Sequence, residues 1–357
     1  MTQSLPDPRV AAALSGPLLE AMEQDAARPL ADVLQTALAA GDDASILAAL
    51  RGTAPAPARR IWQALSSVID AGNEGVGLRL FAIPLVIVAG TRTPATLAGT
   101  LPEMAVIVDL LEKQGAVGVT RNFGLGNALC SAAALEAISP VALWRAARDP
   151  AYRGVADVLP PEPVVVAPGR EQVHLRFLVG AGITPPHLPS FLESAANIAT
   201  WGMQLTRELA RQLAQPGVEI LPIPRPPQPL AKAAYVGRCA QLEAALSLFL
   251  GNNVRHFRMS VGDPQAVLSA HQLDCGTGEL RLSLSSPFDD TLLEGFCWPL
   301  HPLDEIGEVV QLFRRELADC QVNNISVVEA VLPAVLERGM TFVSARAAEI
   351  QRGQLSN

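Results

Sequence analysis

The sequence predicts a mixed α+β protein with an N-terminal helical region, two α/β modules and a short antiparallel meander near the C-terminus. Up to about residue 72, apolar residues recur at three- and four-residue spacing, which is typical of amphipathic helices. Residues 78–90, LRLFAIPLVIVAG, form the longest apolar run and predict a strand buried on both faces. Strand-like segments at 267–273, 279–285 and 292–298, separated by turn residues, predict the meander.

The first half of the chain divides into a helical region, residues 1–74, and a first α/β module, residues 75–160. Breaks at Gly41 and in the segment TAPAP suggest four short helices packed as antiparallel pairs. After the 78–90 strand we expect a helix over 103–114, a strand over 116–123 and an Ala-rich helix through 138. The Pro-rich stretch 157–163 predicts the boundary between the modules.

The second module, residues 161–350, is predicted to mix strands and helices, and residues 351–357 form a polar, frayed tail. The expected elements before the meander are a hairpin of 164–166 with 173–179, a helix over 189–215, a strand over 218–223, a helix over 230–250 and a strand over 254–261. The helix over 230–250 is expected to end at Gly251-Asn252-Asn253, a left-handed cap. After the meander we expect a helix over 304–320 and a strand over 324–331.

An apolar strand with a proline, then a helix, then a second strand, recurs around Pro84, Pro222 and Pro299. Because proline is confined to sheet edges, strand starts and bulges, these prolines are expected to end strands. Internal duplication and coincidence both remain open. The motif Trp298-Pro299-Leu300 and the helix-then-strand order after Gln228 resemble an uncharacterised family of proteobacterial proteins of unknown function, and this resemblance implies no activity.

Composition excludes several classes of protein. The net charge is −8 and no Lys/Arg run is present, so nucleic-acid binding is disfavoured. The 78–90 run is too short to span a bilayer, which needs about 20 apolar residues, so no membrane insertion is expected. The N-terminal residues lack a signal-peptide pattern, and the five scattered cysteines do not form a disulfide framework. A cytoplasmic location is expected.

Two Cys and two His residues form a zinc-ligand set in HQLDC and CWPLH, namely His271, Cys275, Cys297 and His301. In a meander, however, a third strand separates the two pairs by about 9–10 Å, whereas zinc needs ligands within about 2.3 Å. Buried thiols and partly exposed imidazoles are therefore favoured, and zinc is kept as the alternative; no other cofactor is expected.

A second candidate site is Gly124-Leu125-Gly126-Asn127, expected between a strand and a helix. Backbone N–H groups at such a helix start can hold a phosphate, so Gly124, Gly126 and Asn127 are candidate ligand-binding residues. Leu129 stands where a dinucleotide fingerprint needs Gly or Ala, and a tight turn capped by Asn127 is the structural alternative.

No complete catalytic constellation is visible, and we nominate no catalytic residue. Cys130 is expected in an Ala-rich helix that looks buried, and His174 and His256 lie on strand patterns where an imidazole is usually structural. The leading hypothesis is a non-enzymatic cytoplasmic binding or assembly protein that acts through a protein partner or through self-association as a homo-oligomer. The alternative is an enzyme or sensor that binds a phosphorylated small molecule or nucleotide at residues 124–127.

Overall fold

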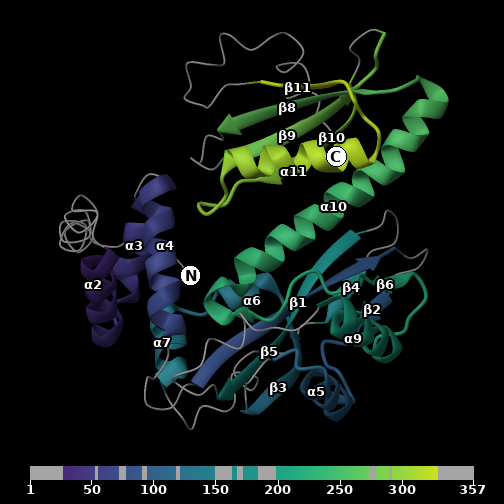
Figure 1. The fold of residues 1–357 in the computed structure, drawn as a ribbon. Coiled ribbons are helices and arrows are strands. Elements are labelled where there is room, and N and C mark those ends of the chain that lie inside the picture. Colours follow the sequence, from purple (N-terminus) through teal and green to yellow (C-terminus); the bar gives the residue numbers. More distant parts are fainter. Residues whose placement is uncertain are drawn as a thin grey trace. The chain divides into compact units, whose positions relative to one another are not determined.

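The computed structural model describes residues 27–52, 55–71, 78–90, 95–117, 121–148, 163–166, 172–183, 198–272, 278–288 and 292–328. These residues form the predicted mixed α+β fold, with helices and a five-stranded, a four-stranded and a two-stranded sheet (Figure 1). The chain divides into two compact units, Met1–Gln241 and Leu242–Asn357. Within the described residues, no helix combines the length and the apolar character that crossing a membrane requires.

The N-terminal helices of the first unit share one apolar cluster, in which Leu34, Leu38 and Ile61 are buried. These helices are α2 (Ala27–Ala40), α3 (Asp43–Gly52), α4 (Pro55–Asp70) and α7 (Pro140–Arg148). Asp43 accepts a hydrogen bond of 2.9 Å from the backbone N–H of Val141, at the start of α7. A carboxylate at a helix N-terminus is favourable, and this one ties α7 to α3. The first of the four predicted helices lies outside the described residues.

The apolar run predicted as a buried strand is β1 (Leu78–Ala89), and it is central in the five-stranded sheet. It pairs antiparallel along its whole length with β5 (Gln172–Ile183), and β3 (Arg121–Cys130) pairs with the other side of β5. On its second side, β1 pairs with β6 (Val218–Ile220) and β7 (Gln228–Pro229). The chain thus returns to the same sheet after residues 157–163, where the Pro-rich sequence predicts a boundary between modules.

Pro84 lies inside β1, and the pairing of the strand explains why it is tolerated. β7 pairs with Phe81 and Ala82, and β6 pairs with residues 87–89, so Pro84 falls between the two partners. The carbonyl of Val86 points to this side and accepts a hydrogen bond of 2.9 Å from Leu221. Proline has no N–H to donate, and at this position it interrupts neither the β1–β6 nor the β1–β7 hydrogen-bond ladder. The expectation that Pro84 ends a strand is wrong.

Helices cover both faces of this sheet. α5 (Met104–Lys113) and α9 (Ile198–Gln212) pack on the face that carries Phe81, Ile83 and Leu85. The first part of α10 (Leu230–Ser260) packs on the opposite face, where Gly237 meets the ring of Phe177. The five-residue helix α6 (Ala132–Glu136) follows β3 directly.

Several predicted elements of this unit differ from the structure. The predicted hairpin is wrong, because β4 (Val164–Val166) pairs with β2 (Ala95–Leu97) and β5 pairs with β1 and β3. The predicted strand over 116–123 is wrong in its first part. Gly115, with φ of +62°, ends α5, and the N–H of Ala116 bonds to the carbonyl of Leu111.

The second unit contains the predicted meander. β8 (Gln265–Gln272), β9 (Gly278–Ser285) and β10 (Leu292–Pro299) pair antiparallel in the order β10-β9-β8, and β11 (Ile325–Val327) pairs parallel with β8. α11 (Ile306–Asp319) carries the buried residues Val309, Phe313 and Leu317. The indole N–H of Trp298 donates to Asp304 at 3.3 Å, and its ring lies 5.9 Å from that of Phe313. The meander and α11 are confirmed.

The predicted break at Gly251-Asn252-Asn253 and the predicted strand over 254–261 are wrong, because α10 continues to Ser260. Leu246, Leu250, Val254 and Phe257 are buried at helical spacing, and the Asn253 side chain donates to the carbonyl of Phe249. The recurring strand–helix–strand unit therefore lacks a strand at Val254. β1 and β10 also belong to different sheets, so the predicted units do not share one sheet.

Candidate functional site

The four-stranded sheet has one apolar face and one polar face. In β9, Leu280, Leu282 and Leu284 point into the core of the second unit. Because side chains alternate along a strand, the intervening residues of β9 lie on the other face. Those residues are Glu279, Arg281, Ser283 and Ser285, and the last three are buried. A buried row of polar side chains needs a reason beyond core packing.

Neighbouring strands add to this row, because directly opposed residues share a face. Arg281 lies opposite Ser269 of β8 and Cys297 of β10, and Glu279 lies opposite His271 of β8. The sheet register therefore brings together residues far apart in the sequence. We call this set the Arg281 face: Ser269, His271, Glu279, Arg281, Ser283 and Cys297.

Arg281 and Glu279 form the ion pair of the Arg281 face. The Nε and Nη2 groups of Arg281 donate to the same Glu279 oxygen, and the two side chains are only 8% and 12% exposed. The Nη1 atom of Arg281 is buried and has no hydrogen-bond acceptor. Leaving a buried donor unpaired costs about 1–3 kcal/mol, and more for a charged group. The guanidinium is thus held in place by Glu279, and its Nη1 donor is unpaired among the described residues.

The other polar groups of the Arg281 face are engaged. The Ser269 hydroxyl and the Nε2 atom of His271 lie 2.8 Å apart in a hydrogen bond. Burial raises the pKa of the Cys297 thiol, as does the Glu279 carboxylate, while Arg281 opposes the increase. A thiol with a raised pKa stays protonated near neutral pH and is a poor nucleophile. The arrangement is suited to binding an acceptor group rather than to nucleophilic chemistry.

The predicted zinc ligands are only partly described. His271 lies on β8 and Cys297 on β10, with β9 between them, which matches the separation expected from a meander. The Nδ1 atom of His301 already accepts a hydrogen bond of 3.1 Å from the backbone N–H of Leu303. Cys275 lies outside the described residues. Among the residues that are described, no three Cys, His, Asp or Glu side chains form a metal-binding group, and the complete set remains a prediction.

The predicted glycine turn has a different local structure. Gly124, Gly126 and Asn127 lie within strand β3, and the residue that caps the next helix is Ser131. β3 pairs irregularly with β5 there, and a Cβ at Gly180 would lie 2.7 Å from the Gly124 carbonyl oxygen. The close approach of the two strands depends on Gly180 of β5, whereas a Cβ at Gly124 would meet nothing within 4 Å. Because Asn127 lies within a strand, the expected helix N-terminus at this residue is wrong. Ligand binding at these residues stays a prediction.

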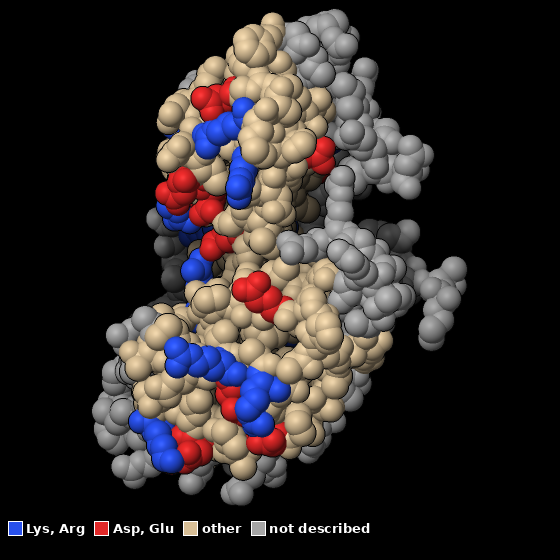
Figure 2. All heavy atoms as spheres, turned by 90° about the vertical axis from the view of Figure 1, so that its right-hand side faces the viewer, with Lys and Arg blue, Asp and Glu red and all other residues tan. Residues whose placement is uncertain are grey.

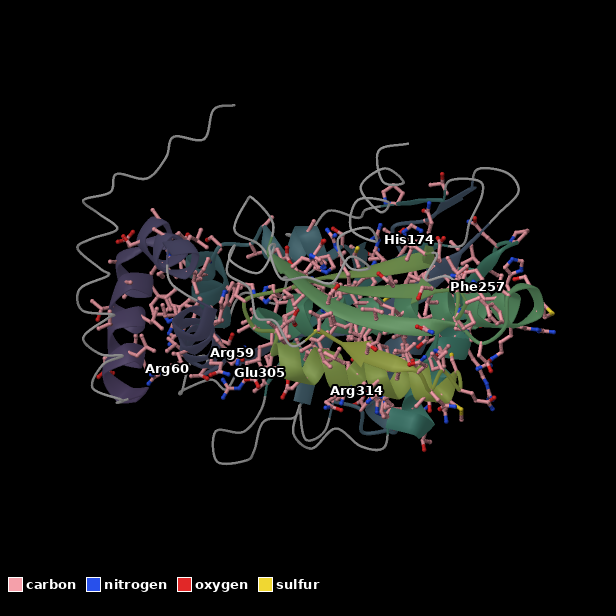
Figure 3. All side chains as sticks on the ribbon, turned by 90° about the horizontal axis from the view of Figure 1, so that it is seen from above. Arg59, Arg60, His174, Phe257, Glu305 and Arg314 are labelled. Atoms are coloured by element: carbon pink, nitrogen blue, oxygen red, sulfur yellow. The ribbon has the colours of Figure 1, made fainter. Side chains whose placement is uncertain are left out.

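Two partly buried ionisable groups of the first unit were not singled out as sites by the sequence. Burial raises the pKa of the Asp70 carboxyl to about 7, and the charges of Lys232 and Arg79 oppose the increase. His174 of β5, labelled in Figure 3, has a buried Nε2 atom without a hydrogen-bond partner among the described residues. Burial lowers its pKa, and the neighbouring Arg176 lowers it further. Among the described residues, neither belongs to a group of three or more His, Cys, Asp or Glu side chains that could hold a metal ion.

The sequence of β9 contains a pattern that indicates the Arg281 face. GELRLSLS alternates polar and apolar residues with a period of two, which marks a strand with one polar face. The sequence does not give the register in which β8 and β10 pair with β9.

No family model matches the chain, and no curated protein or solved structure matches it either.

Proposed function

We propose that the chain is a non-enzymatic cytoplasmic binding or assembly protein that acts through protein–protein contacts. The observation that carries this proposal is the exposure of the large apolar side chains Phe288 and Met259. Four described cysteines, Cys130, Cys239, Cys297 and Cys320, form no disulfide with one another, which is consistent with a reducing compartment.

The chemistry of the Arg281 face favours recognition over catalysis. A general base or nucleophile has to be available to a substrate. Here Glu279 is bound to Arg281, His271 is bound to Ser269, and the Cys297 thiol has a raised pKa. Glu279 and His271 are therefore engaged by neighbouring side chains, and the Cys297 thiol is held in its protonated, unreactive form.

Exposed apolar side chains in the same unit support a protein partner. Phe288 is 84% exposed and Met259 is 75% exposed, the largest values among the exposed large apolar residues that the structure describes. The Phe288 ring lies beside Gly262, three residues after Met259, so both side chains lie near the end of α10. Adjoining exposed apolar groups are typical of contact surfaces.

Charge makes a protein partner more suitable than a nucleic acid. The net charge is −8. On the face shown in Figure 2, basic side chains lie next to acidic ones in small groups and form no continuous basic band. A polyanion needs such a band to release counterions.

The test compares the wild-type chain with Phe288→Ser and with a surface control, Arg314→Gln. Arg314 is exposed on α11 and is labelled in Figure 3. The mass of each purified chain is measured over a hundredfold concentration range by light scattering, and tagged chains are used for native pull-downs from the host. We expect a stoichiometric partner or a concentration-dependent dimer that Phe288→Ser weakens and Arg314→Gln does not. A chain that stays monomeric and captures nothing stoichiometric would contradict the proposal.

A further inference from the structure

We propose that the exposed end of α10 is the contact surface of a homodimer, in which a two-fold axis near Met259 pairs Arg255 of each copy with Asp263 of the other. This inference rests on the proposed function, because it names a second copy of the chain as the partner of the exposed apolar side chains. We call the surface formed by Arg255, His256, Met259, Asp263 and Phe288 the Met259 surface. All five residues belong to the second unit.

The centre of the Met259 surface is apolar and exposed to solvent. Met259 lies in the last turn of α10 and is 75% exposed, and Phe288 is 84% exposed. The other side of this helical segment carries the buried residues Leu250, Val254 and Phe257, so Met259 lies on the side away from the core. Covering both exposed side chains with an equivalent surface is favourable, because it removes apolar area from water.

Opposite charges lie before and after Met259. Arg255 is exposed one helical turn before it, and its side chain has no hydrogen-bond or ion-pair partner within the described part of the chain. Asp263 follows the end of the helix, and its side chain is 80% exposed. Its Oδ1 atom accepts a hydrogen bond of 2.6 Å from Arg258, and its Oδ2 atom has no partner among the described residues. Each charge can therefore take up an opposite charge from outside.

The order of these charges selects a second copy of the chain as the partner. Arg255 is four residues before Met259 and Asp263 is four residues after it. A two-fold axis at Met259, perpendicular to the helix, therefore brings each arginine onto the aspartate of the other copy. Such a contact is self-complementary, because residue i meets residue j and residue j meets residue i. The two charges also balance, so the overall charge of −8 does not cause repulsion at this surface.

The same axis gives Phe288 an aromatic contact. The Phe288 ring lies beside Gly262, which the axis places opposite His256 of the other copy, and His256 is exposed on α10. Pairs of aromatic rings add to the energy of apolar burial. The whole surface consists of one helix end and one turn, so it belongs to the small, weak class of interfaces. We expect micromolar rather than nanomolar self-affinity.

The direct test is sedimentation velocity of the full chain over a hundredfold concentration range, in which the wild type should pass from monomer to dimer. Arg255→Glu sets a glutamate against Asp263, and Asp263→Arg sets an arginine against Arg255, so each variant alone should dimerise about tenfold more weakly. An equimolar mixture of the two variants should regain the dimer, because both of its contacts then join opposite charges. Arg314→Glu makes the same charge change at an exposed position of α11 and should alter nothing.

The apolar centre is tested separately. Met259→Ser and Phe288→Ser should each weaken the dimer about tenfold, and circular dichroism checks that every variant keeps the wild-type fold. A wild-type chain that stays monomeric would overturn the inference, as would a dimer that both charge variants leave intact or that their mixture does not regain.

These outcomes separate the inference from the proposed function. If the chain stays monomeric while the pull-down yields a different stoichiometric partner, only the second-copy inference is wrong. A dimer that the charge variants leave intact forms through another surface, which again overturns only the inference. A chain that stays monomeric and captures no partner contradicts both.

Discussion

Gly237 of α10 lies against the ring of Phe177 on β5, and a Cβ at this glycine would be only 2.4 Å from the Cζ atom. The same Cβ would lie 3.2 Å from a methyl group of Leu175. Phe177 and Leu175 are both buried, so neither has free space to move into. The missing side chain at Gly237 is what lets this part of α10 lie directly on the five-stranded sheet.

We therefore expect Gly237→Ala to destabilise the first unit. Alanine has the higher helix propensity by about 1 kcal/mol, but the clash with Phe177 forces the core to rearrange, which typically costs about 1–3 kcal/mol. Urea unfolding followed by circular dichroism should show a lower midpoint for the variant.

Gly251 in the same helix is the matched control, because a Cβ there meets nothing within 4 Å. Gly251→Ala should leave the midpoint unchanged or raise the stability by up to about 1 kcal/mol. Equal destabilisation by both substitutions would show that the close contact at Phe177 does not limit position 237.

The Asp70 carboxyl makes stability depend on pH. Its pKa is about 7 in the folded chain and 3.8 ordinarily, so the folded state binds the proton more tightly. The contribution of Asp70 to stability is therefore largest below about pH 4, is lost as the pH rises to about 7, and does not change further above that. The shift corresponds to about 4 kcal/mol. Asp70→Asn should remove this dependence and unfold at higher urea than wild type at pH 8, with little difference near pH 4.

Asp109 is the control for Asp70. Its side chain is 58% exposed and forms an ion pair of 2.7 Å with Lys113 one helical turn away. Such surface pairs contribute little, so Asp109→Asn should alter stability by less than about 1 kcal/mol at every pH. A pH slope of Asp70→Asn identical to that of wild type would contradict the assignment.

The buried pair of Glu279 and Arg281 should show strong coupling in a double-mutant cycle. Glu279→Gln leaves the Arg281 charge buried without its counterion, and Arg281→Gln does the reverse, so each is expected to cost about 3–5 kcal/mol. The double variant has no buried charge and should cost clearly less than the sum. Hydrogen exchange of the β9 amides measures these changes within the second unit, and additive effects would mean that the two charges do not interact.

The sequence predicted elements well where one periodicity dominated. The alternation in β9 and the helical spacing of Val309, Phe313 and Leu317 identified the meander and α11 correctly. The helix α10 was interrupted in the prediction because Gly251-Asn252-Asn253 resembles a cap, although Val254 and Phe257 continue the spacing of Leu250. Glycine and asparagine are tolerated within a helix when packing on both sides of them holds it together.

The candidate site was harder to predict from the sequence, because it depends on pairing between strands. His271 and Cys297 were noticed for their chemistry, whereas Arg281 was not, since a lone arginine in a strand is ordinary. Its significance comes from the neighbours that the register supplies, Glu279 on its own strand and Ser269 and Cys297 on either side. Likewise, Gly124 and Gly126 follow a phosphate-loop pattern, but their strand is fixed by a long-range pairing with β5.

Zinc is not expected to contribute to the stability of the second unit. His271 and Cys297 lie on strands separated by β9, and the Nδ1 atom of His301 is bonded to Leu303, so the described ligands do not converge on one tetrahedral centre. Protein purified without a His-tag should contain far less than one zinc per chain by elemental analysis. Treatment with EDTA should leave the unfolding midpoint unchanged, because removing a structural zinc would otherwise cost much of the folding free energy. Stoichiometric zinc that is lost in Cys297→Ser would overturn this expectation and require Cys275 to lie close to His271 and Cys297.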